Sequence, residues 1–211
     1  MEKETIVKHK FFITDIDKVQ QFIDNYREKG YKLAYVNRDS FSFIFKKCHD
    51  DFNPKVRIDY RSFKKRDDFQ EYLTLFEDSG WKHLSGSFSS GIQYFEQMNE
   101  DSDDEIFSDK QSHAELYRRL FAFAITFLGL FLVYLFVFGP RYDLSLYLHP
   151  KDMFLTPGLW EMNGSRFAFA FLFELPFVIL RNGFPVIWLI CVILFSSCAI
   201  KVKKKELALK K

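Results

Sequence analysis

Two uninterrupted apolar runs near the C-terminus are the strongest pattern in the chain. The run 120–138 contains no charged residue, and neither does the run 184–200. A helix needs ~20 apolar residues to cross the ~30 Å hydrocarbon core of a bilayer, and both runs are close to that length. They predict a hairpin of two transmembrane helices, with the lipid bilayer as the first partner of the protein.

Basic residues border each run on one side and predict the topology. They are Arg118 and Arg119 before the first run, and Lys201, Lys203, Lys204 and Lys205 in the tail 201–211 after the second. Lysine and arginine beside membrane helices stay on the cytoplasmic side, and an even number of crossings places both clusters there. We therefore expect a multi-pass membrane protein with both termini in the cytoplasm. Residues 1–12 lack the apolar stretch of a signal peptide.

The loop 139–183 between the two runs contains a shorter apolar segment, 166–180, around Glu174. A third crossing would bring this carboxylate near the bilayer centre, at a cost of about 2.5–3.5 kcal/mol. It would also leave only residues 181–183 as a turn before the last span. We expect the loop to be extracytoplasmic and the segment to be an interfacial helix or a re-entrant piece.

The N-terminal part of the chain is a duplication. A shift of fifty residues, without a gap, places Gly30 on Gly80 and Phe45 on Phe95, and it keeps apolar positions on apolar positions at helical spacing. The repeats are 5–47 and 55–97, within a domain 1–98 on the cytoplasmic side. Duplication of a stable unit is a sufficient explanation, and it implies no function by itself.

Each copy has the pattern of strand, helix, strand and strand. In the first copy we expect strands at 5–13, 31–36 and 41–47, around a helix whose apolar stripe runs from Ile16 to Tyr26 and which ends at Gly30. In the second copy we expect strands at 55–63, 81–86 and 91–97, and a helix at 67–79. This predicts an α+β fold, with one six-stranded, mainly antiparallel sheet and two helices, followed by the membrane hairpin.

The segment 99–119 connects the domain to the first span. Its first half is acidic, but it lacks the glycine and the terminal glutamate of a calcium loop, so a solvated linker is expected. Residues 112–119 are expected to begin a helix that continues into the span, which would couple the domain to the membrane through a stiff rod.

Composition excludes several classes of function. The net charge of +2 and the scattered basic residues give no footprint for direct binding of nucleic acid. The three cysteines and five histidines have no metal-ligand spacing, and no catalytic motif or glycine-rich phosphate loop is present. We therefore expect no catalytic residue, no metal and no cofactor. The oligomeric state has no signature in the sequence.

One strand carries a pattern that suggests a site. Between Val56 and Arg61 the residues alternate, so that Arg57, Asp59 and Arg61 fall on one face of the sheet. The simplest interpretation is an exposed face whose charges pair with each other through Asp59. The alternative is a ligand or partner groove on the face away from the helices, in which Arg57 and Arg61 bind an anionic group. The aromatic walls of that groove would be Tyr35, Trp81 and Tyr94.

These residues resemble a known family. The residues that carry the similarity are the run 56–61, Tyr72, Phe76-Glu77, Gly80-Trp81, Tyr94-Phe95 and finally Glu105-Ile106-Phe107-Ser108-Asp109. Through them the chain is similar to the bacterial family DUF2812 over about residues 5–120. The resemblance implies a cell-membrane protein of Gram-positive bacteria, often encoded beside PadR-type transcriptional regulators. It assigns no chemistry to Arg57, Asp59 or Trp81.

Three functions remain open. The preferred hypothesis is a non-enzymatic sensor or adaptor, whose cytoplasmic domain binds a transcriptional regulator, another membrane-protein partner or a small ligand. The second is an enzyme or transport accessory in which Asp59 acts on an anionic or lipid-like substrate. It is disfavoured because a carboxylate between two arginines is a poor general base at neutral pH. The third is a structural subunit of a larger membrane complex.

Overall fold

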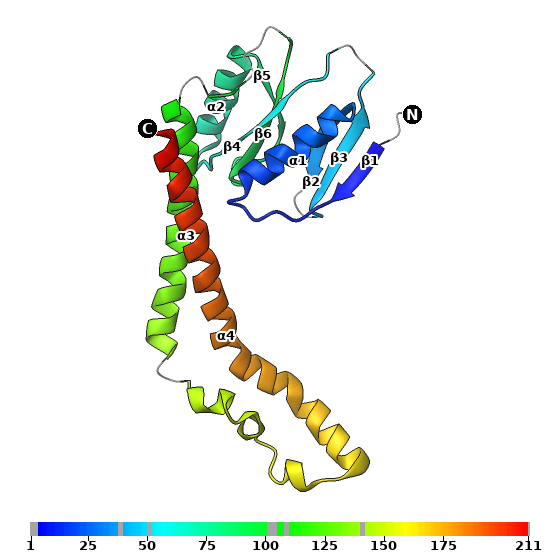
Figure 1. The fold of residues 1–211 in the computed structure, drawn as a ribbon, viewed down its shortest axis with the longest axis vertical. Helices are drawn as coiled ribbons and strands as arrows, with labels where there is room; N and C mark the ends of the chain where they lie inside the picture. The colour runs from blue at the N-terminus through cyan, green and yellow to red at the C-terminus, as the bar shows by residue number, and fades with distance from the viewer. Residues whose placement is uncertain are drawn as a thin grey trace. The chain divides into compact units, whose positions relative to one another are not determined.

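The computed structural model describes residues 4–37, 40–49, 52–100, 105–107, 110–139 and 142–210. The chain forms two compact units, one of Met1–Leu120 with Val202–Lys211 and one of Phe121–Lys201. Most of the expected acidic linker lies outside the described residues, and so do residues 38 and 39 between the second and third expected strands. Figure 1 shows the helices and strands of both units.

The first repeat contains β1 (Glu4–Lys8), α1 (Ile16–Glu28), β2 (Tyr31–Asn37) and β3 (Ser42–Lys47). The second contains β4 (Val56–Tyr60), α2 (Arg66–Asp78), β5 (Trp81–Ser85) and β6 (Ile92–Gln97). The predicted order of elements therefore occurs twice. Both helices are followed by a glycine in the left-handed region, Gly30 at φ 80° and Gly80 at φ 81°, as a helix stop requires.

The strands form two three-stranded antiparallel sheets, β1-β3-β2 and β4-β6-β5, and the expected single sheet of six is not confirmed. The edge strands β2 and β5 have irregular registers at matching places, between Leu33 and Tyr35 and between His83 and Ser85. Bulges of this kind twist an edge strand and interrupt its ladder. A hydrogen bond of 3.0 Å, donated by Ser85 Oγ to the carbonyl of Val36, connects these two strands.

The strand registers correct the gapless alignment of the repeats. Lys8 lies opposite Ser42, whereas Tyr60 lies opposite Ile92. Ser42 and Ile92 are fifty residues apart, as in the gapless alignment, but Lys8 and Tyr60 are fifty-two residues apart. The first strands of the two repeats, β1 and β4, therefore align with a shift that is two residues larger. The connection from first strand to helix is two residues shorter in the second repeat, because β4 and α2 are separated by residues 61–65, and β1 and α1 by residues 9–15.

Each repeat has an aromatic core between its helix and its sheet. Tyr26 of α1 stacks on Phe45 of β3 at 4.3 Å between ring centroids, and Phe76 of α2 stacks on Phe95 of β6 at 4.1 Å. Phe45 and Phe95 are fully buried. The stripe expected on α1 is also buried, at Ile16, Val19 and Ile23. Burial of these apolar faces is what holds each helix on its sheet.

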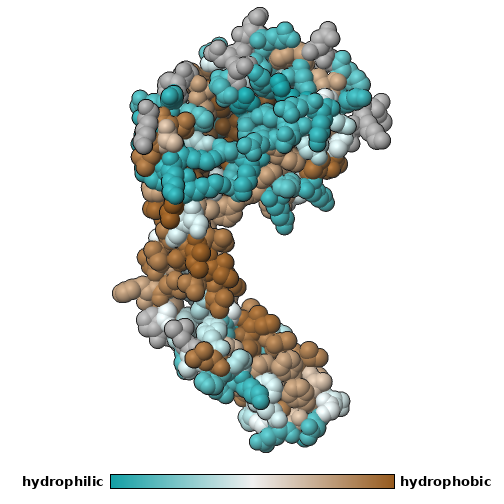
Figure 2. Space-filling model, viewed as in Figure 1, coloured by the Kyte–Doolittle hydropathy of each residue, from teal (hydrophilic) through white to brown (hydrophobic). Residues whose placement is uncertain are grey.

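Two long helices, α3 (Lys110–Phe138) and α4 (Gly164–Leu209), are long and apolar enough to cross a membrane. Apolar side chains along both are exposed, for example Val133 at 62 % and Phe169 at 75 %. The core helix of a soluble protein would bury such residues, so the exposure is compatible with a lipid environment. Figure 2 shows this as a largely brown surface on the helices, in contrast to the largely teal surface of the first unit.

Residues 181–183, the turn that a third crossing would need, lie inside α4, which is one continuous helix of 46 residues. Pro176 and Pro185 lie inside α4, and Figure 1 shows the helix bending in its orange part. A proline removes one backbone hydrogen bond and bends a helix without ending it when the flanking turns persist. At 1.5 Å per residue, α4 is roughly 69 Å long, about twice the hydrocarbon core of a bilayer.

The loop of the second unit folds against α4. Its described part contains three short 3-10 helices, η2 (Leu144–Tyr147), η3 (Pro150–Met153) and η4 (Leu159–Glu161). The carboxylate of Glu174 accepts hydrogen bonds from the backbone N–H groups of Leu155 and Thr156. The charge that made a third span costly therefore has hydrogen-bond donors supplied by the loop.

Candidate functional site

The alternation predicted for β4 is present. Val56, Ile58 and Tyr60 are buried in the core. Arg57 lies opposite Phe95, and Asp59 lies opposite Gln93, so these residues share one face of the sheet. The expectation that this face points away from the helices is wrong, because α2 packs on it and the start of α3 reaches it.

Asp59 is the centre of this face, and its side chain is only 3 % exposed. The sequence pattern suggested that its carboxylate pairs with Arg57 or Arg61. It pairs instead with Arg119 of α3, at 2.6 Å. It also accepts a hydrogen bond of 2.8 Å from the hydroxyl of Tyr72 in α2. Arg119 in turn donates to the backbone carbonyl of Tyr60 at 2.6 Å. One carboxylate thus joins β4, α2 and α3.

The Tyr72 hydroxyl is held in its protonated form. Burial first, and then the charge and hydrogen bond of Asp59, raise the pKa of Tyr72 far above its ordinary value. A phenol in this environment acts as a permanent hydrogen-bond donor at physiological pH. Its role is therefore to position the Asp59 carboxylate.

The two arginines of β4 have separate partners. Arg57 pairs with Glu105 at 3.1 Å and with Asp24 of α1 at 3.5 Å, and its side chain is only 15 % exposed. Arg61 lies over the rings of Phe63 and Tyr72, at 5.4 Å from each centroid. Arg57 therefore ties α1 to the described part of the connection before α3, and Arg61 covers the Asp59–Tyr72 pair.

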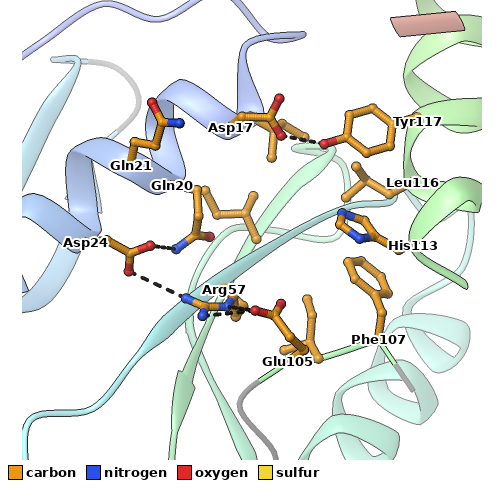
Figure 3. A pocket seen from close by; sticks show the side chains of 13 residues that line it. Asp17, Gln20, Gln21, Asp24, Arg57, Glu105, Phe107, His113, Leu116 and Tyr117 are labelled. Atoms are coloured by element: carbon orange, nitrogen blue, oxygen red, sulfur yellow. Dashed lines mark hydrogen bonds and ion pairs between the residues drawn. The ribbon is translucent and has the colours of Figure 1, made fainter. Parts of the chain in front are cut away.

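A pocket of about 270 Å³ opens between α1, β4 and α3 (Figure 3). Figure 3 shows Asp24, Arg57 and Glu105 connected by dashed lines along one wall, and Phe107 beside His113 on another. The rings of Phe107 and His113 stack at 5.0 Å. Burial lowers the pKa of His113, against the opposing effect of the Glu105 and Asp59 charges, so the imidazole is neutral at physiological pH.

A second pocket, of about 350 Å³, lies on the other side of residues Ile106 and Phe107, which line both. Asp59, Tyr72 and Arg119 line this second pocket. We refer to the two pockets together as the β4–α3 site. Its combined size suits a small ligand or an inserted side chain of a partner. Among the described residues, no three His, Cys, Asp or Glu side chains are grouped to hold a metal ion.

The comparison with protein families decides where this chain belongs. The profile of a family described as "Protein of unknown function (DUF2812)" matches residues 15–129, more than half of the chain. The chain belongs to the DUF2812 family. No curated protein and no solved structure matches it. The DUF2812 match extends from α1 into the apolar run of α3, so it includes every part of the β4–α3 site.

The aromatic residues expected around this DUF2812 site lie elsewhere. Trp81 is almost fully buried in the core with Tyr72, Phe76 and Phe95. Tyr94 points to the opposite face of its sheet, where it lines a different, mainly apolar pocket. Tyr35 is half-exposed on β2 and lines neither pocket of the site. The structure brings together Arg57, Asp59 and Arg61, but not these three aromatic residues.

The basic tail also packs against the first unit. Lys205 pairs with Asp17 of α1, which accepts a hydrogen bond of 2.5 Å from the hydroxyl of Tyr117 in α3. Glu206 is buried between Lys203 at 2.8 Å and Lys210 at 2.6 Å. Of the remaining residues predicted to set the topology, Arg118 pairs with Glu115, Lys204 is exposed, and Lys201 is half-buried.

Sequence reasoning missed Tyr72, Glu105, Tyr117 and the second role of Arg119. Arg119 was explained completely by its place beside the apolar run, so nothing pointed to a partner on β4. Glu105 and Phe107 had a signal, because they belong to the motif that carries the family resemblance. A motif without assigned chemistry gave no reason to place them beside Arg57.

Proposed function

We propose that this chain is a non-enzymatic, membrane-anchored sensor or adaptor, whose first unit binds a protein partner or a small ligand at the β4–α3 site. The observation that carries the proposal is that α3 is one helix with two roles. Its first turns supply His113, Tyr117 and Arg119 to the site, and its remainder is the apolar run. Occupancy of the site therefore acts directly on a helix that enters the bilayer.

The contacts of the tail support a cytoplasmic location for both termini. Lys205 and Asp17 are in ion-pair contact, so the tail and the N-terminal repeat lie on the same side of any membrane. An even number of crossings follows, and the lysines favour the cytoplasmic side in a bacterial cell membrane. At roughly twice the required length, α4 can cross once and leave its first part, with Glu174, at the outer interface.

The single six-stranded sheet is part of the same proposal. Ser85 already links the edges of β2 and β5, and a partner strand or a bound ligand that flattens the two bulges would allow the ladders to join. The preferred partner is a transcriptional regulator of the PadR type. A regulator held at the membrane would be released or retained according to the state of α3.

The test is a crosslinking pull-down of the full-length protein from native membranes. Gln21 is exposed on α1 and lines the pocket of Figure 3, so Gln21→Trp fills that pocket without removing an internal contact. Asn25→Trp, on the same helix but outside the pocket lining, is the matched control. We expect one protein or small molecule to be captured by the wild type and by Asn25→Trp, and to be lost from Gln21→Trp.

Two outcomes would contradict the proposal. The first is equal capture by Gln21→Trp and Asn25→Trp, which would place the partner elsewhere. The second is the absence of any specific crosslink, together with unchanged behaviour of the neighbouring regulator in a deletion strain. Substrate turnover by the purified full-length protein would favour the enzyme hypothesis instead.

A further inference from the structure

The connection between β4 and α2 is strongly basic. Its five residues 61–65 and the first residue of α2 have the sequence Arg61-Ser62-Phe63-Lys64-Lys65-Arg66; they contain four positive charges, and all four of these side chains are exposed. Within the part of the chain that the structure describes, Lys64, Lys65 and Arg66 have no ion-pair partner. Asp67 and Asp68 follow in the first turn of α2, so residues 61–68 keep a net charge of about +2. We call residues 61–66 the basic segment.

The contacts of Arg119 place the basic segment beside the last charged turn of α3. Arg119 is the last charged residue before the apolar run 120–138. Its guanidinium donates to the carbonyl of Tyr60, the residue directly before the basic segment, and pairs with Asp59. The basic segment therefore begins beside the last charged residue before the apolar run. The other end of β4 is roughly 13 Å away, at 3.3 Å per residue.

We propose that the basic segment binds the headgroups of anionic lipids. Unpaired lysines and arginines next to the end of a membrane helix are attracted by the negative surface of a cytoplasmic leaflet, and this attraction decays within a Debye length. The proposal rests on the proposed membrane anchoring. It adds a lipid contact that reports to the β4–α3 site, because Arg61 of the same segment covers the Asp59–Tyr72 pair.

Charge and position favour lipid over other anionic partners. A nucleic acid needs a wider basic surface than six residues, and the net charge of the chain is only +2. An acidic peptide would compete with the bilayer for a segment that is already adjacent to it. These partners are tested below as alternatives.

The experiment compares the labelling of lysines in the full-length protein, reconstituted in nanodiscs of phosphatidylcholine alone or mixed with phosphatidylglycerol. Acetylation rates of Lys64 and Lys65 are measured by mass spectrometry. We expect both to fall about fivefold in the anionic nanodiscs, the factor that corresponds to one basic side chain at such a surface. The difference should vanish at ~1 M salt, where the screening length is about 3 Å.

Lys82 is the internal control. It is exposed and lies opposite Glu96, which lies opposite Val56 at the far end of β4. Its rate should be equal in the two lipids. Lys65→Glu should reduce the protection of Lys64, whereas the matched Lys82→Glu should leave it unchanged.

The outcomes separate this inference from the proposed function. A protein that does not enter the nanodiscs refutes the membrane anchoring itself. A protein that enters them, but shows equal rates for Lys64 and Lys65 in both lipids, refutes the lipid site alone. Protection that depends on added RNA or on an acidic peptide, and not on phosphatidylglycerol, would also overturn it.

Discussion

The two repeats share a core but differ on one face of the sheet. Both contain a stacked helix–sheet pair, Tyr26 with Phe45 and Phe76 with Phe95, and both have a bulge in the strand after the helix. These features are internal to each repeat. Both repeats keep them because a substitution of either ring would disrupt the packing of the helix on its sheet.

The difference lies where α3 meets the second repeat. By strand register, the position of Asp59 is occupied by Val7 in the first repeat, and the helix position of Tyr72 is occupied by Phe22. Likewise, His9 occupies the position of Arg61 in the first repeat. Its ring stacks on Phe22, as the guanidinium of Arg61 lies over the ring of Tyr72. An apolar pair in one repeat is thus a carboxylate–hydroxyl pair in the other. The first strand of a repeat therefore has a polar attachment to α3 in the second repeat only, whereas both repeats share the aromatic core.

The largest expected effect tests the shared part of this comparison. Phe45→Ala and Phe95→Ala should each lower the free energy of unfolding by about 3–5 kcal/mol, because each removes a fully buried ring and leaves a cavity. The measurement is denaturant unfolding of the full-length protein in detergent. Losses that differ by more than ~2 kcal/mol would show that the two cores are not equivalent.

The next effect concerns the polar attachment. Asp59→Ala leaves Arg119 and Tyr72 without their partner and should cost about 3 kcal/mol, at the low end for a buried pair because the Arg119 side chain is 30 % exposed. The matched control is Asp67→Ala, an exposed acid on α2, with a change within about 0.5 kcal/mol. Equal effects of the two substitutions would refute the structural role of Asp59.

A triple variant gives two positions of the second repeat the apolar residues of the first and removes their partner on α3. Asp59→Val with Tyr72→Phe and Arg119→Leu removes all three polar side-chain groups together, so none of the three is left buried without a partner, although the Tyr60 carbonyl loses Arg119 as a donor. We expect its stability to return to within about 1 kcal/mol of the wild type. Capture of the partner in the pull-down should nevertheless be lost. A triple variant as unstable as Asp59→Ala would mean that the pair contributes net stability.

The second attachment, at Asp17, should be weaker. Tyr117→Phe removes only the hydroxyl that donates to Asp17, and it should cost about 1 kcal/mol, because Asp17 keeps Lys205 as a partner. Thermal unfolding of the full-length protein measures this. The control is Tyr31→Phe, a half-exposed tyrosine at the start of β2, whose loss should be within about 0.5 kcal/mol.

The smallest expected effect is a dependence on pH. Burial lowers the pKa of both His113 and His83 in the folded protein, so the unfolded chain takes up protons first as the pH falls. Stability should therefore be constant above the ordinary histidine pKa of about 6.5 and decrease as the pH falls below it. His113→Gln should flatten this decrease in part, and His83→Gln should flatten the remainder. A stability that rises between pH 7 and pH 5.5 would contradict the burial of both rings.

Local patterns predicted the elements of this fold well, because each depends on its own residues. The stripe from Ile16 to Tyr26, the glycine stops and the alternation in β4 each reflect the period of a single helix or strand. The gapless alignment failed at the connection between the first strand and the helix. This connection is two residues shorter in the second repeat, and the difference changes neither the strand pattern before it nor the helix pattern after it.

The candidate site was predicted only in part, since it depends on contacts distant in sequence. The alternation selected Arg57, Asp59 and Arg61, but no local signal shows that Arg119, sixty residues later, pairs with Asp59. The course of residues 181–183 also depends on such contacts, and only a third crossing would have made them a turn. In α4 the Asn182 amide instead donates to the carbonyl of Val178, and the Tyr147 hydroxyl donates to the Asn182 carbonyl, so the helix continues.

The Asp17 carboxylate also imposes an order in time. Asp17 leaves the ribosome near the beginning of synthesis, and Lys205 leaves it near the end, after both long helices have been made. Their contact is consequently among the last that the chain completes, and only a tail delivered to the compartment of the N-terminal repeat can complete it. If the long helices cross a membrane as proposed, a molecule whose tail ends on the other side leaves Asp17 without Lys205.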